Sequence, residues 1–146
     1  MKLCIASDHR GYKLKEQLKK HLINKYEIED LGTNSEESTD YTKYAFLLGE
    51  KVKNKECDFG IAICGTGIGI SIACNKVKGI RCAKVDNIED VKLTRNDNDS
   101  NIIAFKGTTE LSKAIEYVET FINTPFSTEE KHIRRVNDII NYERGI

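Results

Sequence analysis

The sequence has no net charge, no long apolar run and a single proline, and these absences exclude several classes of protein. Basic and acidic residues number 23 each in the 146-residue chain, so we expect no nucleic-acid partner and no membrane-surface partner. No apolar run reaches the length of a membrane span or of a signal-peptide core. The one proline, Pro125, lies outside every periodic segment. We expect a cytoplasmic globular protein.

The five cysteines are odd in number and include no C-x-x-C pair, which is typical of a reducing compartment rather than of a disulfide framework. The three histidines show no metal-ligand spacing among themselves or with the cysteines, so we predict no metal site. The residues are Cys4, Cys57, Cys64, Cys74 and Cys82, with His9, His21 and His132.

Two hydrophobic periodicities alternate along the chain. Apolar or β-branched runs of strand length cover 3–6, 27–31, 59–64, 80–85 and 102–105. Apolar residues spaced three or four apart predict helices containing Leu14, Tyr41, Leu111 and Ile133, and Ser127–Glu130 resembles a capping box before the last of them. The alternation predicts a single three-layer α/β/α domain over residues 1–146, Rossmann-like, with a five-stranded parallel sheet and helices on both faces.

The predicted sheet indicates where a ligand binds, because open α/β sheets hold ligands beyond the carboxyl ends of their strands, where the strand order reverses. Three segments follow predicted strands and carry polar or glycine residues: 7–9, 64–69 and 86–87. We expect Asp8 and His9 to face Cys64 across this crevice.

The segment 64–69 has glycine at alternate positions: Gly65, Gly67 and Gly69. Such a loop lets a ligand approach the backbone, and the helix after it presents free N–H groups, which favours anion or oxyanion binding. The alternative is a tight strand-to-helix turn in which the glycines serve packing alone. Ile70 rules out a dinucleotide-binding fingerprint and a cysteine-phosphatase loop, and no Gly-Lys-Ser/Thr is present for a P-loop.

Cys64 is the one cysteine at a place where a thiolate would be stabilised, beside glycine amides and a helix N-terminus. It could act as a nucleophile or as a general base, or be a small buried hydrophobe, as we expect of the other four cysteines. Asp8 could bind a hydroxyl group or cap a helix. Lys131 and Arg135, four residues apart, could bind phosphate or form a solvated charged face.

The chain resembles the ribose-5-phosphate isomerase B family, which also contains galactose-6-phosphate isomerase subunits. The resemblance covers essentially the whole chain. It rests on segments that recur in order: Ser7–Tyr12, Thr39–Tyr41, Ile63–Ser71 with the sequence ICGTGIGIS, Asn75–Arg81 and Asn98–Asp99. It implies aldose–ketose interconversion of a small-molecule sugar phosphate, most simply ribose 5-phosphate to ribulose 5-phosphate, through a cis-enediolate and without a cofactor.

The resemblance also implies roles for individual residues. Cys64 would move a proton between C2 and C1, Thr66 would assist proton transfer at the oxygens, and the amides of 65–69 would stabilise the enediolate. The family acts as a dimer whose C-terminal helix, here about 128–142, reaches the partner's site, so a homodimer or a dimer of dimers is expected. Substrate contacts are implied for Asp8, His9, Tyr41, Gly65, Gly67, Gly69, Asn98, Lys131 and Arg135.

Three departures from the family pattern limit this transfer. Asp97 stands where members usually carry the histidine that opens the sugar ring, Thr108 stands where many have arginine, and Lys131 replaces another arginine. Aspartate is normally ionised at neutral pH and is then a poor proton donor. Either burial keeps Asp97 protonated, or His9 takes over, or the natural substrate needs no ring opening. Fewer arginines predict weaker phosphate discrimination.

These departures leave other functions open. The substrate could be another sugar phosphate, with an acyclic tetrulose phosphate or a hexose phosphate as the main alternatives. A non-catalytic phosphosugar or nucleotide sensor would tolerate loss of Cys64. A redox switch at Cys64 is disfavoured because no resolving cysteine is evident.

Overall fold

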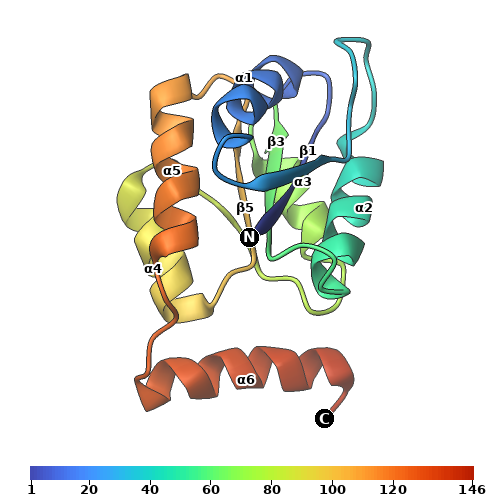
Figure 1. The fold of residues 1–146 in the computed structure, drawn as a ribbon. Coiled ribbons are helices and arrows are strands. Elements are labelled where there is room, and N and C mark those ends of the chain that lie inside the picture. Colours follow the sequence, from blue (N-terminus) through green and yellow to red (C-terminus); the bar gives the residue numbers. More distant parts are fainter.

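The computed structural model describes residues 1–146 and contains one five-stranded, all-parallel sheet with six helices (Figure 1). The strand order is β2-β1-β3-β5-β4, which confirms the predicted three-layer α/β/α fold. No helix is both long and apolar enough to cross a membrane. The elements are β1 (Lys2–Ser7), α1 (Tyr12–Leu22), β2 (Glu27–Asp30), α2 (Tyr41–Lys53), β3 (Phe59–Cys64), α3 (Ile68–Cys74), β4 (Cys82–Lys84), α4 (Ile88–Asn98), β5 (Ile102–Lys106), α5 (Leu111–Asn123) and α6 (Glu130–Arg144).

Alternation along the strands separates two hydrophobic cores. Large residues such as Leu3 and Ile5 face α1, α4 and α5, whereas small residues such as Cys4 and Ala6 face α2 and α3. Because strand side chains alternate between faces, this pattern assigns each helix layer to one side of the sheet. The small residues leave room for α2 and α3 to pack close to β1 and β3.

The strand order reverses between β1 and β3, which lie side by side in the sheet. The connection from β1 leads away to β2 through α1, and the connection from β3 leads the other way through α3. The crevice between those connections opens at the carboxyl ends of the two strands. This is where the sequence places Asp8, His9 and Cys64.

One helix lacks a sequence signal and one local prediction is wrong. No apolar stripe marks residues 88–98, where α4 forms, because its buried side includes the polar Thr94 and Arg95, which obscure the helical periodicity. The capping box at Ser127–Glu130 does not form, because α6 starts at Glu130 and the Ser127 hydroxyl accepts a hydrogen bond from the Glu129 N–H at 2.9 Å.

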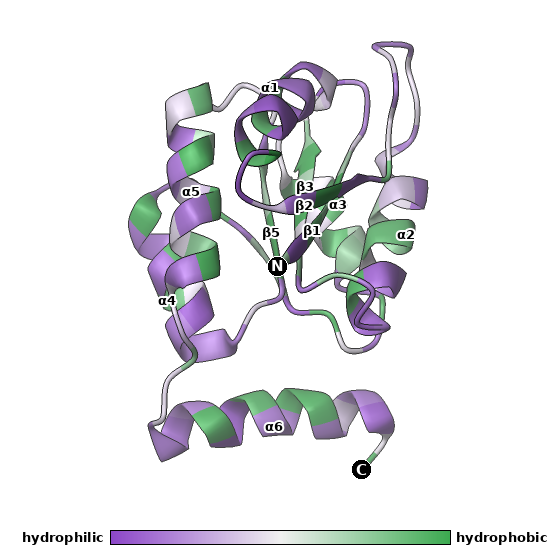
Figure 2. Ribbon diagram, viewed as in Figure 1, coloured by the Kyte–Doolittle hydropathy of each residue, from purple (hydrophilic) through white to green (hydrophobic).

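The last helix, α6, lies across the amino ends of the strands, joined to α5 by an extended segment (Figure 1). Its apolar positions form a stripe among polar ones (Figure 2). Only His132 and Val136 in this helix are buried, while Ile133 and Ile139 remain 39% and 44% exposed. Much of the apolar side of α6 is therefore uncovered in one chain.

A buried lysine ties α1 to β2 and makes the stability depend on pH. The fully buried Lys15 ammonium lies 2.6 Å from Asp30 Oδ2, and Lys19 Nζ also lies 2.6 Å from that oxygen. Burial alone would raise the pKa of Asp30, but the hydrogen bonds from Lys15 and Lys19 outweigh it and hold this pKa below its usual value.

We expect the free energy of unfolding to fall in acid as Asp30 becomes protonated. A lowered folded-state pKa stabilises the fold fully above the unfolded-state pKa of about 3.9. The contribution is lost as the pH falls through the folded-state value, with a slope of up to about 1.4 kcal/mol per pH unit. Urea unfolding from pH 6 to pH 2 measures this slope. Asp30→Asn should flatten it and the exposed control Glu36→Gln should not; equal slopes for both would contradict the assignment.

Candidate active site

The carboxyl ends of β1, β3 and β5 meet around Cys64. The Asp8 N–H donates to the Ile63 carbonyl at 3.3 Å, and the Gly107 N–H donates to the Cys64 carbonyl at 2.8 Å. These two hydrogen bonds extend the sheet ladder by one residue beyond each strand. The loops that carry Asp8, Cys64 and Gly107 are thereby held together at one edge of the sheet.

The Cys64 sulfur is buried and accepts a hydrogen bond from the Gly67 N–H, with a distance of 3.2 Å. Gly67 has a φ of +79°, and a Cβ there would lie 2.8 Å from the Phe105 carbonyl carbon. Glycine is therefore required at 67 for two reasons: its left-handed backbone and its contact with β5. The structure therefore places Cys64 beside a glycine amide at the end of β3, just before α3, and its part in proton transfer stays a prediction.

The turn after Cys64 leaves backbone donors free. The N–H groups of Gly65 and Thr66 have no acceptor within the chain, whereas the Ile68 N–H donates to Thr66 Oγ1 at 3.1 Å. The Thr66 hydroxyl is exposed at the rim and keeps its proton available for donation. Two free amides and one hydroxyl next to a sulfur can stabilise an oxyanion and move a proton on it.

His9 is held in one orientation by the loop before α2. Its Nδ1 accepts a hydrogen bond from the Thr39 N–H at 3.2 Å, so the neutral ring carries its proton on Nε2. The Thr39 hydroxyl lies 3.2 Å from the Tyr44 hydroxyl. Hydrogen bonds from Thr33 and Thr39 lower the pKa of Tyr44. Thr39 thus positions His9, a role that residue spacing alone does not indicate.

The two carboxylate oxygens of Asp8 differ in their contacts: one holds the backbone and the other is free. Its Oδ1 accepts hydrogen bonds from the Arg10 and Gly11 N–H groups, at 2.9 and 3.1 Å, which fixes the turn before α1. Its Oδ2 has no hydrogen-bond partner in the chain. The alternative that Asp8 caps a helix is wrong, because Gly11 is the N-cap of α1 and no side chain caps it. Asp8 instead fixes the preceding turn, and one carboxylate oxygen remains for a ligand hydroxyl group.

Tyr41, the first residue of α2, lies against the glycine loop. A Cβ at Gly69 would come within 2.7 Å of the Tyr41 ring and 3.0 Å of its hydroxyl oxygen. Only a glycine at 69 permits this contact. The Tyr41 hydroxyl therefore lies at the start of α3, near the free amides.

A cavity of about 530 Å³ opens beside this loop, and it contains two cations that sequence reasoning missed. Arg10 packs its aliphatic chain over Gly65, where a Cβ would lie 2.8 Å from Arg10 Cδ and 3.1 Å from Nη1. Lys13 pairs with Glu36 at 3.4 Å, and both side chains are exposed. Arg10 could have been suspected, since it directly follows Asp8 and His9. The cavity is lined by His9, Arg10, Lys13, Glu36, Gly65, Gly107 and Thr108.

Four residues predicted for the site lie at the other end of the sheet. α4 runs back from the carboxyl end of β4 to the amino end of β5, so Asp97 and Asn98 lie at the amino ends of the strands. Asp97 Oδ1 is 3.7 Å from His132 Nε2 of α6, the helix that also carries Lys131 and Arg135. One chain does not bring these four residues to Cys64, so their part in its site remains a prediction that requires a second chain.

The third predicted segment, 86–87, has a structural role. Asn87 caps α4, with its side-chain oxygen accepting a hydrogen bond from the Asp90 N–H at 2.9 Å. The Asp86 carbonyl accepts from the Tyr117 hydroxyl at 2.8 Å. Because β4 is the edge strand, this segment lies two strands away from Cys64.

Comparisons with known proteins agree with this arrangement. The family model for Ribose/Galactose Isomerase matches residues 3–139. Ribose-5-phosphate isomerase B of Escherichia coli K12 is 38% identical over 98% of this chain and 97% of its own. The structure of ribose-5-phosphate isomerase B from Clostridium thermocellum superposes with a TM-score of 0.95 and 42% identity, covering 99% of both chains. The enzyme from Mycoplasma genitalium with bound ribulose-5-phosphate gives a TM-score of 0.92 and 38% identity, covering 99% of this chain and 97% of the other.

Proposed function

The chain belongs to the Ribose/Galactose Isomerase family, and from that membership we propose that it interconverts ribose 5-phosphate and ribulose 5-phosphate without a cofactor. The observation that carries the proposal is the Cys64 sulfur, which accepts the Gly67 N–H beside two unoccupied amide donors. An aldose–ketose isomerase needs a base for a carbon-bound proton and donors for the oxyanion that forms. The turn after β3 supplies both.

The proposed reaction begins at Cys64. The Cys64 thiolate takes the proton from C2 of the open-chain aldose, and the electron pair moves toward the C1 oxygen. The N–H groups of Gly65 and Thr66 stabilise the enediolate, while the Thr66 hydroxyl transfers a proton between the two oxygens. Cys64 then returns its proton to C1, which gives the ketose and regenerates the thiolate.

The cavity beside the loop suits the rest of the substrate. Arg10 offers a guanidinium group and His9 offers its Nε2 proton to the phosphate, and Asp8 Oδ2 is free for a sugar hydroxyl group. Tyr41 lies next to Gly69 at the loop and adds a further donor. In this assignment Arg10 supplies, from the end of β1, a cation close to Thr108, where many family members have arginine.

We infer that the active form is a homodimer, with a dimer of dimers as the alternative. One chain forms a single isomerase domain whose α6 exposes Ile133 and Ile139, and Ile68 and Ile72 of α3 are 51% and 56% exposed next to the glycine loop. Pairing would cover these apolar surfaces and bring Asp97, Asn98, Lys131 and Arg135 of one chain to the Cys64 cavity of the other. The five free cysteines favour a reducing compartment such as the cytoplasm.

Asp97→His is expected to raise kcat on ribose 5-phosphate by about tenfold, because an imidazole can both donate and accept the ring-opening proton near pH 7. The measurement is ketose formation from the cyclic pentose phosphate and, in parallel, from an acyclic tetrulose phosphate. The acyclic substrate should show no gain. Equal rates for wild type and variant on the cyclic sugar would show that ring opening does not limit turnover at this position.

The proposed function is tested by ketose formation from ribose 5-phosphate, with tetrulose and hexose phosphates assayed alongside. Highest kcat/KM on ribose 5-phosphate is expected. If only another sugar phosphate is turned over, the protein is an isomerase with a different substrate. Binding without turnover of any of them would indicate a sensor, the alternative that the aspartate at 97 favours.

A further inference from the structure

A second cavity, of about 390 Å³, lies at the amino ends of the strands, far along the sheet from Cys64. Three separate segments form it: the end of α2 before β3, the turn before β4, and the last turns of α6. Because Cys64 ends β3 at the opposite edge, this cavity is separate from the Cys64 cavity of the same chain.

The lining of this cavity is strongly basic although the whole chain carries no net charge. Five cations and one carboxylate line it: Lys53, Lys55, Lys78, Arg81 and Arg144 with Glu143. Two of the cations already have an acidic partner, Lys53 with Glu50 at 3.8 Å and Arg81 with Asp99 at 3.5 Å. Lys55, Lys78 and Arg144 have no ion-pair partner, although Lys55 and Arg144 lie at helix C-termini, where the helix dipole favours a positive charge. Like charges gathered in one place repel each other unless an anion lies between them.

The backbone at Lys55 adds an independent observation. Lys55 has a φ of +62°, at the position after α2 where helices usually place glycine or asparagine. A lysine in the left-handed region costs about 1 kcal/mol relative to glycine, which the helix dipole offsets in part. A ligand that uses the Lys55 charge would add to that compensation.

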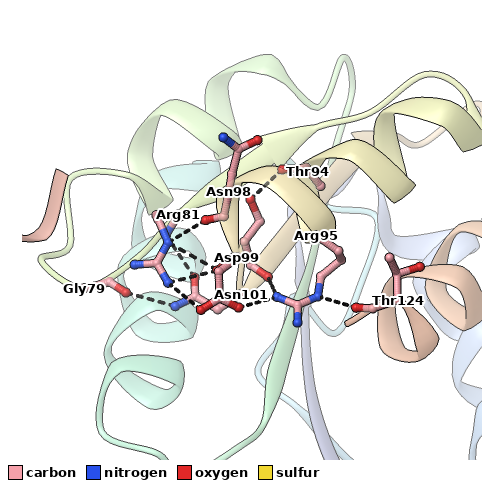
Figure 3. Close-up of polar contacts among 9 residues, drawn as sticks. Gly79, Arg81, Thr94, Arg95, Asn98, Asp99, Asn101 and Thr124 are labelled. Carbon is pink, nitrogen blue, oxygen red and sulfur yellow. Dashed lines mark hydrogen bonds and ion pairs between the residues drawn. The ribbon is translucent and has the colours of Figure 1, made fainter. Parts of the chain in front are cut away.

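Hydrogen bonds join three residues that line the cavity, Gly79, Arg81 and Asn101 (Figure 3). The Asn101 side chain donates to the Gly79 carbonyl at 2.9 Å and accepts from the Arg81 N–H at 2.9 Å. The Arg81 guanidinium donates to the Asn98 and Asp99 carbonyls, each at 2.9 Å. The Gly79 N–H donates to Glu143 at 2.9 Å, which fixes the end of α6 and occupies that carboxylate. Hydrogen bonds thus hold Arg81 and the end of α6, which carries Arg144.

We propose that this cavity binds a small anion with two or more linked phosphate groups. Its volume exceeds that of one phosphate, and three of its cations, Lys55, Lys78 and Arg144, have no ion-pair partner. Only Val52 and Ile140 in the lining are apolar, so phosphate groups rather than a large apolar moiety provide the recognition. Lys55 and Lys78 have no ion-pair partner in the chain, so their charges are available to this ligand.

Calorimetric titration of the full-length protein with tripolyphosphate tests the proposal, with orthophosphate as the weaker comparison. Lys55→Gly removes the charge and suits the left-handed backbone, and Lys78→Gln removes a charge from an exposed turn. Each should weaken tripolyphosphate binding by about tenfold, the value of one charge-assisted contact. Lys113→Gln, an exposed lysine on α5, is the matched control and should bind as the wild type does.

Arg10→Gln distinguishes this cavity from the one beside Cys64, and its result does not depend on isomerase activity. The proposal is supported if tripolyphosphate binding is retained in Arg10→Gln and lost in the Lys55→Gly/Lys78→Gln double variant. The double variant should also keep its kcat on the sugar phosphate. The opposite pattern would place the anion beside Cys64 and overturn it. A short single-stranded oligonucleotide is a further probe. If it binds more tightly than tripolyphosphate, and if the double variant no longer binds it, the occupant is a nucleic acid and the proposal is overturned.

Discussion

Replacing Cys64 by alanine is expected to reduce kcat on ribose 5-phosphate by about 10²–10⁴-fold, the usual contribution of a general base. The sulfur is the acceptor of the Gly67 N–H and the group next to the free amides of Gly65 and Thr66. Alanine removes it without adding volume to a buried position. KM should change little, because the proposed substrate contacts of Arg10 and Asp8 are untouched. A stopped or coupled assay of ketose formation measures both kcat and KM.

Two further variants distinguish a base from a packing residue at this position. Cys64→Ser keeps an acceptor for the Gly67 N–H but replaces the thiol with a much weaker acid, so it should be nearly as inactive as Cys64→Ala. Cys57→Ala removes another buried cysteine, one that lies before β3 at the opposite end of the sheet, and should keep kcat. Retained turnover in Cys64→Ala, with the fold intact by circular dichroism, would move the base elsewhere.

The Cys64 half of the site could be predicted from the sequence because its parts are local. A strand that ends at Cys64 and a glycine loop that leads into a helix place sulfur and amides together by covalent connection alone. Asp8 and His9 follow from one topological rule about the carboxyl ends of neighbouring parallel strands. The roles of Thr39 and Arg10 were not predicted, because they depend on contacts across loops, which produce no periodic pattern in the sequence.

The other half of the site could not be located, for a physical reason specific to α4. Its buried side carries Thr94 and Arg95 in place of an apolar stripe, so neither the helix nor its direction is evident from the sequence. Without that direction, Asp97 and Asn98 cannot be assigned to an end of the sheet. The order β3-β5-β4 is equally hidden, since hydrophobic pattern does not distinguish a central strand from its neighbour.

Arg95→Met is expected to lower the free energy of unfolding by about 2–4 kcal/mol, because two carbonyl groups lose their hydrogen-bond donor. The buried Arg95 guanidinium donates to Asp99 Oδ1 and to the Ser100 carbonyl, both at 2.8 Å, and to the Thr124 carbonyl at 3.1 Å (Figure 3). It also packs against the rings of Phe59 and Phe121, 5.0 and 5.6 Å from their centroids. Methionine keeps an apolar contact with these rings but leaves two carbonyls unpaired.

Chemical denaturation measures the loss, and Arg134→Met is the matched control. Arg134 pairs with Glu130 on the exposed surface of α6, so its removal should cost less than about 1 kcal/mol. Equal losses in the two variants would show that the Arg95 contacts do not stabilise the fold.

The same arginine tests how the two halves of the site are joined. Arg95 ties the end of α4 to the start of β5 and the end of α5, and that end of α4 carries Asp97 and Asn98. Within one chain these residues lie at the opposite edge of the sheet from Cys64. A fall in kcat of the Arg95 variant, measured at a temperature where it is fully folded, therefore requires a route through a second chain. The decisive experiment mixes Arg95→Met subunits with Cys64→Ala subunits. In a mixed dimer one of the two sites combines an intact Cys64 with an intact α4 from the other chain, so activity should recover if the site is shared and stay low if it is not.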